Sequence, residues 1–410
     1  MDCVLRMKNT IQPYAWGSRN ALAGLLGQTQ PSDGPQAELW MGAHPKAPSK
    51  VYLSEQWQNL DRVIRDDPVA ILGVEVSRHY GNQLPYLFKV LAAGQPLSIQ
   101  AHPGKQQAIR GFERENDQGI PLTAGHRNYK DSNHKPECIC ALTPFWGMCG
   151  FRPVDDMLAL MRMVWPSTNH IDLDRFGLVS PNPSLQPFFE FLMTMAPGKR
   201  KQLIRHVTTA AVPLAGQYVE FGWVVRLNRH YPDDIGVLSP ILLNLFCLEP
   251  EQALFLPAGQ LHAYLDGMGI EIMANSDNVL RGGLTSKHVD STELLKILDF
   301  QPRPLEPLSA VCMGPGEYRY PSDAGEFVLT RLRVVDGQRH VSQSLEIPSP
   351  HILLCTQGEA FIQWNEGGSD MVLPQGQSAL VPASLAGYTV SGNATLYRAS
   401  VNHNVSQNIS

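Results

Sequence analysis

Closely spaced turn residues divide the first 150 residues of the chain into short apolar segments, and this pattern restricts the fold more than any other feature. Two examples are Tyr86–Leu91 and Leu97–Ala101, which lie between Pro and Gly residues. Short strands separated by frequent turns are typical of β-sandwiches and β-barrels. The same pattern returns after Val237, in the segments 327–335, 351–356, 360–364 and 379–381. The sequence therefore predicts a mainly β protein.

The apolar period changes between Pro153 and about Tyr231. The segment 154–161 opens with two acidic residues and continues with apolar residues at helical spacing, and acidic residues in a first turn favour a helix start. Three further segments have apolar residues three and four positions apart, at 184–195, 198–211 and 215–230. We therefore expect a helical domain inserted into the β protein.

An internal similarity links the two β-rich regions. Residues 252–258 (QALFLPA) resemble residues 377–383 (QSALVPA), and in the same register Gly267 meets Gly392. A strand, a Pro-containing turn and a second strand repeated in this way suggest two related β-sandwich units. In this register His262 meets a glycine, Gly387, so the second unit lacks that histidine.

The charge and hydrophobicity of the chain argue against two classes of partner. The net charge is −5, which leaves no broad basic surface for nucleic acid. An anionic substrate would need a local cluster of Lys and Arg. The start, Met1–Arg6, does not resemble a signal peptide, and the longest apolar stretch, 240–248, is too short to span a bilayer. We expect no nucleic-acid or membrane partner.

The seven cysteines form no disulfide framework, because their number is odd and their spacing is irregular. Reduced thiols in a cytoplasmic protein fit this pattern best. Cys138 and Cys140 lie two positions apart in an apolar segment, and we interpret them as small buried residues rather than metal ligands.

Three short segments could supply ligands to one metal ion. Gln100 and His102 lie two positions apart in a strand, so their side chains face the same side, and Pro103 places them near a strand end. Glu137 begins an apolar strand, where a carboxylate is costly to bury unless it is paired or bound to a metal. His262 follows a Pro/Gly turn and begins another short apolar segment.

Together these side chains would offer a metal ion a mixed set of nitrogen and oxygen ligands. Sandwich domains of the cupin type build metal sites in this way. Zinc readily accepts His and Glu, but the same set could hold manganese or iron, so ligand type does not decide the metal. Each segment taken alone has a plainer interpretation, as a packed histidine or a solvated turn.

A polar segment at 269–287 follows the third candidate ligand segment. It combines acids, amides, Arg281 and Lys287 with a Gly-Gly pair. Loops of this polarity often carry function, although the glycines also fit an ordinary exposed turn.

These segments together resemble type I phosphomannose isomerases. Residues 129–137 (YKDSNHKPE) match that family's Tyr-x-Asp-x-Asn-His-Lys-Pro-Glu signature throughout, and residues 262–287 match its second signature nearly throughout. Supporting matches lie at 13–18 and 38–45, whereas the last hundred residues match only in strand pattern. Two positions depart from the family pattern, and we expect both to loosen the loop after the arginine. They are Gly282, in place of Ala, and Ser286, in place of Pro.

The resemblance implies a zinc-dependent interconversion of mannose 6-phosphate and fructose 6-phosphate. It implies one zinc ion per chain, held by Gln100, His102, Glu137 and His262. It also implies cupin-like jelly-roll domains, catalytic and C-terminal, with an inserted α-helical domain. We accordingly predict a catalytic jelly roll at 1–150 plus 240–306, a helical insertion at 151–239, and a C-terminal jelly roll without metal ligands at 307–410. We expect the chain to act as a cytoplasmic monomer.

Aldose–ketose isomerisation moves a proton between C1 and C2 through an enediolate, whose negative charge a metal or a cationic side chain stabilises. The resemblance implies that Arg281 and Lys135 take part in catalysis. A base must carry the proton, and the candidates are Lys135, Glu271 and Asp277, with Lys135 favoured.

The phosphate needs cations and donors away from the metal. We assign Lys89 and Ser98 to it, on strands near the ligand pair, with support from the resemblance. Trp16 and Tyr264 are expected to line the sugar pocket.

Two other function classes remain open. A cupin metal oxygenase would need open metal positions and usually a redox-active metal, and the phosphate-compatible cations argue against it. A sugar-binding module without catalysis would not need acid/base candidates beside metal ligands.

Overall fold

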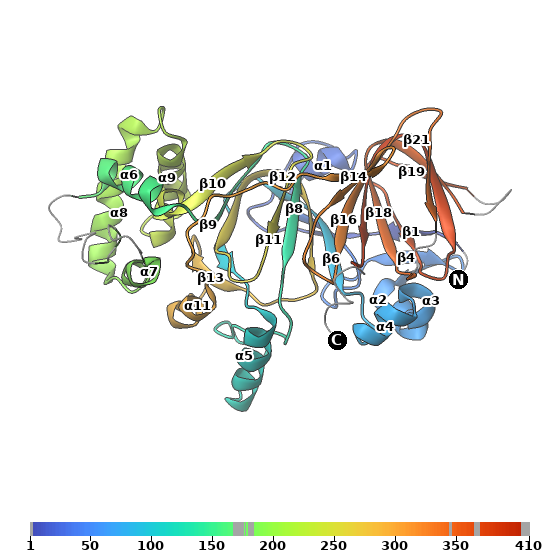
Figure 1. Cartoon of the computed structure of the whole chain (residues 1–410), viewed down its shortest axis with the longest axis horizontal. Coiled ribbons are helices and arrows are strands. Elements are labelled where there is room, and N and C mark those ends of the chain that lie inside the picture. The colour runs from blue at the N-terminus through green and yellow to red at the C-terminus, as the bar shows by residue number, and fades with distance from the viewer. Residues whose placement is uncertain are drawn as a thin grey trace.

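Two large antiparallel sheets form the body of the computed structural model (Figure 1). The structure describes residues 3–402 except 167–175, 177, 179–183, 344–346 and 365–369. The mainly β fold predicted from the turn spacing is confirmed. Both sheets pack their apolar faces into buried cores, and helices lie at the ends and edges of the sheets.

The first sheet has ten strands and is organised around its longest strand, β12. That strand pairs with β6, β7, β8 and β9, so it collects segments that lie far apart in the sequence. The strands are β2 (Thr10–Gln12), β3 (Glu38–Met41), β6 (Tyr86–Ala93), β7 (Ile99–Ala101), β8 (Glu137–Ala141), β9 (Phe145–Phe151), β10 (Leu243–Leu248), β11 (Ala253–Leu256), β12 (His262–Ala274) and β13 (Leu280–Gly283).

The second sheet has eleven strands, most of them from the C-terminal part of the chain. The strands are β1 (Leu5–Lys8), β4 (Lys50–Leu53), β5 (Gln56–Asn59), β14 (Val311–Gly314), β15 (Glu317–Tyr320), β16 (Val328–Val334), β17 (Arg339–Gln343), β18 (His351–Gln363), β19 (Asp370–Pro374), β20 (Ser378–Val381) and β21 (Gly387–Ser400). Strand β1 pairs with β20, and β4 and β5 continue the same sheet. Three strands near the N-terminus thus extend the C-terminal sheet.

Most predicted strands coincide with observed ones, and one differs in an informative way. The predicted strands 351–356 and 360–364 are a single strand, β18. Its pairing with β21 shifts register between Cys355 and Gln357, and Gly358 has a positive φ of 72°. A bulge with a glycine bends a strand without ending it, so the turn signal in the sequence marks a bend here.

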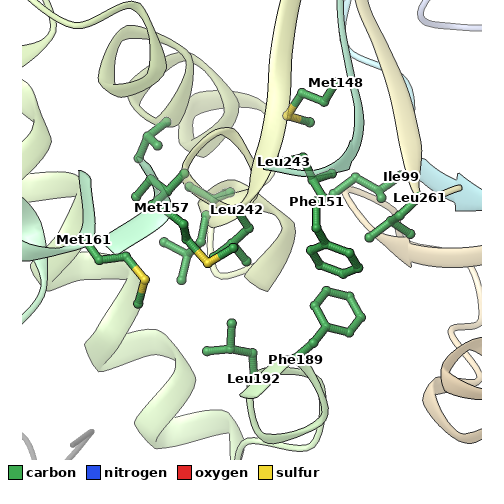
Figure 2. Close-up of a cluster of buried hydrophobic side chains, with 14 of the residues drawn as sticks. Ile99, Met148, Phe151, Met157, Met161, Phe189, Leu192, Leu242, Leu243 and Leu261 are labelled. Atoms are coloured by element: carbon green, nitrogen blue, oxygen red, sulfur yellow. The ribbon is translucent and has the colours of Figure 1, made fainter. Parts of the chain in front are cut away.

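The helices of the predicted insertion are confirmed. They are α6 (Val154–Val164), α7 (Leu185–Met193), α8 (Pro197–Ala211) and α9 (Val219–His230), and they gather at one end of the molecule beyond β9 and β10 (Figure 1). Figure 2 shows how they are attached: Met157, Phe189 and Leu192 from the helices pack against Phe151 and neighbouring residues of the sheet.

The other described helices lie partly within and partly outside this group, and all but one of them have seven residues or fewer. They are α1 (Ala21–Leu25), α2 (Leu60–Asp66), α3 (Pro68–Leu72), α4 (Val74–His79), α5 (Lys105–Asp117), α10 (Ser239–Leu242) and α11 (Ser291–Ile297), with 3₁₀ turns η2 (Val212–Leu214) and η3 (Ile235–Leu238). The sequence did not predict α5, because charged residues dominate it. Within the described residues, no helix combines the length and hydrophobicity needed to cross a membrane.

The internal repeat is confirmed in the predicted register. Strands β11 and β12 correspond to β20 and β21, and both long strands contain a glycine at the aligned position. Gly267 has φ 116° and Gly392 has φ 106°. A Cβ would stand 2.5 Å from the carbonyl oxygen of Pro144 at the first and 2.5 Å from that of Glu359 at the second. The close backbone approach explains why both strands carry glycine there.

We propose that the chain divides into the three predicted domains, which are a catalytic jelly roll, a helical insertion and a C-terminal jelly roll. Hydrogen bonding across the second sheet would then place β1, β4 and β5 with the C-terminal unit, although they precede residue 150 in the chain.

Candidate metal centre and active-site pocket

Three buried side chains converge where three strands of the first sheet begin or end. His102 follows β7, Glu137 opens β8 and His262 opens β12, and all three are at most 2% exposed. The Nε2 atom of His102 lies 3.2 Å from Oε1 of Glu137, and Nε2 of His262 lies 3.4 Å from Oε2. The sequence predicted these three residues as ligands, and the fold brings them together.

Hydrogen bonds fix the orientation of both imidazoles. Nδ1 of His102 lies 2.7 Å from the carbonyl oxygen of Asn278, and Nδ1 of His262 lies 2.9 Å from that of Gln260. Because a carbonyl only accepts, each Nδ1 carries the proton and each Nε2 presents a lone pair. Both Nε2 atoms and one oxygen of Glu137 lack a hydrogen-bond donor. Lone pairs facing a carboxylate repel one another unless a cation lies between them.

The spacing of these atoms suits zinc. Zinc binds His nitrogen and carboxylate oxygen at about 2.0–2.2 Å, so two tetrahedral ligands lie about 3.4 Å apart. The separations of 3.2 and 3.4 Å agree with that value. In the described part of the chain, this is the one group of three or more His, Cys, Asp or Glu side chains with ligand atoms within 4.8 Å of one another.

Gln100, the fourth ligand predicted from the sequence, lies beside this group. It lies on β7 directly opposite His262 of β12 and opposite Arg281 of β13. Its side chain also lines the adjoining pocket.

Two of the three grouped side chains, His102 and Glu137, are held in the charge states that suit metal binding. Burial lowers the pKa of His102 to about 4, so the ring is neutral near neutral pH,. Burial alone would raise the pKa of the Glu137 carboxyl, but Lys135 and His102 hold that pKa well below its usual range. The Nζ atom of Lys135 forms an ion pair with Oε1 of Glu137 at 2.9 Å.

Cys138 and Cys140 are not part of this group, as expected. Both are buried, and burial raises the pKa of each thiol. The Sγ atom of Cys140 lies 3.7 Å from the hydroxyl of Tyr397, on the side of the second sheet.

A pocket of about 480 Å³ adjoins the metal centre. A cavity of this size accommodates a small polar metabolite. Nine residues predicted from the sequence line it, namely Trp16, Lys89, Ser98, Gln100, Lys135, Glu137, Tyr264, Glu271 and Arg281.

Comparisons with known proteins agree with this geometry. The catalytic domain of type I phosphomannose isomerase matches residues 4–154. The chain is 40% identical to mannose-6-phosphate isomerase of Salmonella typhimurium over 396 aligned residues. The alignment covers 96% of this chain and 98% of that protein. The chain belongs to the type I phosphomannose isomerases.

Other relatives extend the comparison. The Escherichia coli mannose-6-phosphate isomerase is 39% identical over 96% of this chain and 98% of its own length. A solved structure of the Salmonella typhimurium phosphomannose isomerase, an alanine variant, superposes with a TM-score of 0.90 at 38% identity, covering 97% of this chain and 99% of that one. A zinc-bound mannose 6-phosphate isomerase structure gives a TM-score of 0.89 at 39% identity over the same shares.

Two cations line the pocket of this phosphomannose isomerase without a side-chain partner among the described residues. Within the described residues, the side chains of Arg281 and Lys287 make no hydrogen bond or ion pair. Burial lowers the pKa of both groups, and the neighbouring Arg281 lowers that of Lys287 further. Cations that are partly desolvated and unpaired favour an anionic ligand. Lys287 belongs to the polar segment 269–287, but no role was predicted for it from the sequence.

Lys89 lies in a different environment from the one we expected. Its Nζ atom lies 3.1 Å from Glu271 and 3.7 Å from Glu38, and it stands over the ring of Trp40. Burial disfavours the ammonium, but the two carboxylates raise the pKa of Lys89 overall. The charge of Lys89 is therefore already balanced inside the protein.

Asp277 does not line the pocket. Its carboxylate lies 2.8 Å from Nζ of Lys46 and 3.5 Å from Nε2 of His44. Burial opposes its ionisation, but hydrogen bonds from His44 and Lys46 hold its pKa below the usual range. Of the three predicted bases, Lys135 and Glu271 face the pocket and Asp277 does not.

The segment that carries the arginine is a strand. We expected Gly282 to loosen a loop after Arg281, but Gly282 lies with Arg281 in β13, which pairs with β7. A Cβ on Gly282 would meet Leu261 at 3.0 Å and Ile99 at 3.3 Å. Pairing with β7 therefore fixes the main chain of Arg281 despite the glycine beside it.

The pocket also contains side chains that the sequence did not reveal. They are Tyr14, Glu38 and Tyr231. Tyr231 follows α9 of the helical group and donates its hydroxyl to the carbonyl oxygen of Pro96 at 2.7 Å. This region is predicted from the sequence to be a separate helical insertion, so no local signal indicated that one of its residues reaches the pocket.

Proposed function

We propose that this chain is a zinc-dependent aldose–ketose isomerase that interconverts mannose 6-phosphate and fructose 6-phosphate. The observation that carries the proposal is the buried His102–Glu137–His262 group beside a pocket with unpaired cations. The family membership and the zinc-bound relative support the same activity.

In this proposal His102, Glu137, His262 and Gln100 hold one zinc ion. Bound zinc supplies a Lewis acid that stabilises negative charge on the sugar oxygens. The four ligands come from neighbouring strands of one sheet, so their positions are fixed before the substrate binds.

Lys135 and Glu271 are the proton carriers that we propose. In the forward direction a base removes the proton from C2, the C1 oxygen gains a proton, and an enediol forms. Loss of the proton from the C2 oxygen and protonation of C1 then give the ketose, with no net change in atoms. Lys135 contacts the proposed metal ligand Glu137 at 2.9 Å, and this contact is our reason for favouring Lys135 for the transfer.

Burial raises the pKa of the Glu271 carboxyl, although Lys89 opposes this. A raised pKa suits a carboxyl that exchanges protons near neutral pH. We therefore propose that Lys89 keeps Glu271 in place, rather than binding the phosphate as the sequence suggested.

In this proposal Arg281 and Lys287 bind different negatively charged groups of the substrate. Arg281 lies opposite the ligand Gln100 in the sheet, and we assign it to the oxygens at C1 and C2. Lys287 lies beyond the end of β13, and we assign it, with Ser98, to the phosphate.

An NMR experiment in D₂O tests the function and separates it from its alternatives. Incubation with mannose 6-phosphate should produce fructose 6-phosphate with deuterium at C1, because an enediol exchanges the transferred proton with solvent. Consumption of O₂ in place of isomerisation would indicate a metal oxygenase. Saturable binding without conversion would indicate a sugar-binding module.

Raising the pH should weaken substrate binding through Lys287. Burial and the neighbouring Arg281 lower its pKa from the ordinary lysine value, so as the pH rises through the alkaline range the ammonium that we assign to the phosphate is lost earlier than in an ordinary lysine. We expect KM for mannose 6-phosphate to increase about tenfold over this range, the value of one hydrogen bond to a charged group. In Lys287→Arg the charge persists, so KM should stay flat. A constant KM in the parent enzyme, or an equal rise in Lys287→Arg, would remove the assignment.

Elemental analysis should find one zinc ion per chain. In the repeat, Val381 of β20 faces His351 as Leu256 of β11 faces Glu137. The C-terminal unit thus has a histidine where the first unit has its carboxylate, and Gly387 where the first unit has its second histidine. A second stoichiometric zinc bound within residues 307–402 would contradict this prediction.

A further inference from the structure

Asn278 is fully buried between the segments that carry the candidate metal ligands. It is 0% exposed and lies just before β13. Its position is unusual because its side chain and its main chain contact different parts of the site. The function proposed above gives this residue no role.

The side chain of Asn278 binds the loop that leads to Lys135 and Glu137. Its Oδ1 atom accepts hydrogen bonds from the main-chain N–H groups of Lys130 at 2.6 Å and Asp131 at 3.2 Å. Its Nδ2 atom donates to the carbonyl oxygens of Asp131 at 2.8 Å and Asn133 at 2.9 Å. One amide therefore satisfies four main-chain groups of this loop, and a buried network with all its groups satisfied is rigid.

Neighbours of Asn278 reinforce the same connection. Ser276 donates its hydroxyl to Oδ1 of Asp131 at 2.8 Å, and the main-chain N–H of Asp277 donates to Oδ2 of Asp131 at 2.8 Å. The segments 130–133 and 275–278 are thus held together along their length, with Asn278 at the centre.

The main chain of Asn278 holds the first candidate ligand. Its carbonyl oxygen accepts the proton on Nδ1 of His102 at 2.7 Å, which leaves Nε2 free to bind a metal. Three residues further along, Arg281 enters the pocket from β13. A single buried residue thereby connects His102, the loop before Glu137, and the strand of Arg281.

We propose that Asn278 is a positioning residue for the metal centre. Its side chain anchors its carbonyl oxygen against His102, and the same anchor sets where Glu137 begins β8. This inference rests on the metal site proposed above. Groups that orient a metal-binding histidine typically change metal affinity by about 10–100-fold when they are removed.

The test is the zinc dissociation constant, measured by competition with a chromophoric chelator on the full-length chain. In Asn278→Ala the carbonyl remains but its anchor is lost, so we expect zinc to bind about 10–100-fold more weakly. Asn278→Asp keeps the volume but sets a carboxylate against two carbonyl oxygens, and zinc affinity should fall at least as far. If the alanine variant does not fold, the aspartate variant decides the question alone.

Asn402→Ala is the matched control. Asn402 is also buried, and its Nδ2 donates to the carbonyl oxygens of Ser322 at 2.9 Å and Ala324 at 3.0 Å, in the C-terminal part of the chain. This variant should lose thermal stability and keep the zinc affinity of the parent protein. Parent-like zinc affinity in folded Asn278 variants with a lowered melting temperature would overturn the inference and leave the proposed function intact. Failure of the parent protein itself to bind zinc would overturn the proposed site together with this inference.

Discussion

Removal of the metal, either by prolonged chelation or by His262→Ala, should lower kcat by about 10³-fold or more. The Lewis acid contributes several kcal/mol of charge stabilisation in the transition state, and each 1.36 kcal/mol corresponds to tenfold in rate. Added zinc should restore the chelated enzyme, because its ligands are intact. It should not restore His262→Ala, because this variant has lost one of the proposed metal-binding nitrogens beside Glu137. Coupled assays and metal analysis on the same samples measure both effects.

His351→Ala provides the control for this experiment. His351 is a buried histidine of the C-terminal sheet, at the position that corresponds to Glu137 in the repeat. Its replacement should leave zinc content and kcat close to those of the parent enzyme. Full activity of the metal-free parent would show that catalysis needs no metal, and zinc retained at parental affinity by His262→Ala would show that the metal centre lies elsewhere.

Arg281→Lys should lower kcat by about 10²-fold or more, the scale of losing one preorganised oxyanion donor. Lysine keeps the positive charge but lacks the rigid planar fork of the guanidinium, so the exchange is not conservative at such a site. Within the described residues the side chain of Arg281 makes no hydrogen bond or ion pair, so zinc content and melting temperature should stay near the parental values.

Steady-state kinetics and zinc analysis separate the possible roles of Arg281. A loss confined to KM would make the residue a uniform binding contact, and lost zinc would make it a support for the metal ligands. Unchanged kinetics would remove the catalytic assignment. Arg226→Lys is a suitable comparison, because Arg226 pairs with Asp266 at 2.7 Å outside the residues that line the pocket, and it should have little effect on kcat.

The convergence of the three candidate ligands could be predicted from the sequence because each has a weak local signal and the family signatures connect them. A charged or imidazole side chain at the end of an apolar strand is costly unless it has a partner, and this holds for His102, Glu137 and His262. The family signatures then joined the three segments. The roles of these residues remain proposals, whereas their proximity is a property of the fold.

The environment of Lys89 could not be predicted in the same way. Lys89 lies opposite Glu271 only because β6 and β12 pair in one particular register, and nothing within either strand specifies that register. For the same reason the sequence could not exclude Asp277, whose carboxylate turns toward Lys46 on a different loop. A polar loop indicates that function is near but not which way each side chain points.

Long-range pairing also limited the prediction of the sheets. Leu5 pairs with Leu380, although the two residues lie near opposite ends of the chain. No local sequence pattern could therefore predict that β1 belongs to the C-terminal sheet. The repeat was easier to detect, because Gly267 and Gly392 occupy backbone positions that favour glycine in both units.

Titration of zinc into the metal-free protein, with conversion of mannose 6-phosphate followed at each addition, tests the central claim most directly. The proposed site predicts that isomerase activity starts near zero, rises in proportion to added zinc, and stops rising at one equivalent per chain. Full isomerase activity before any zinc is added, or no conversion of mannose 6-phosphate at any zinc concentration, would contradict it.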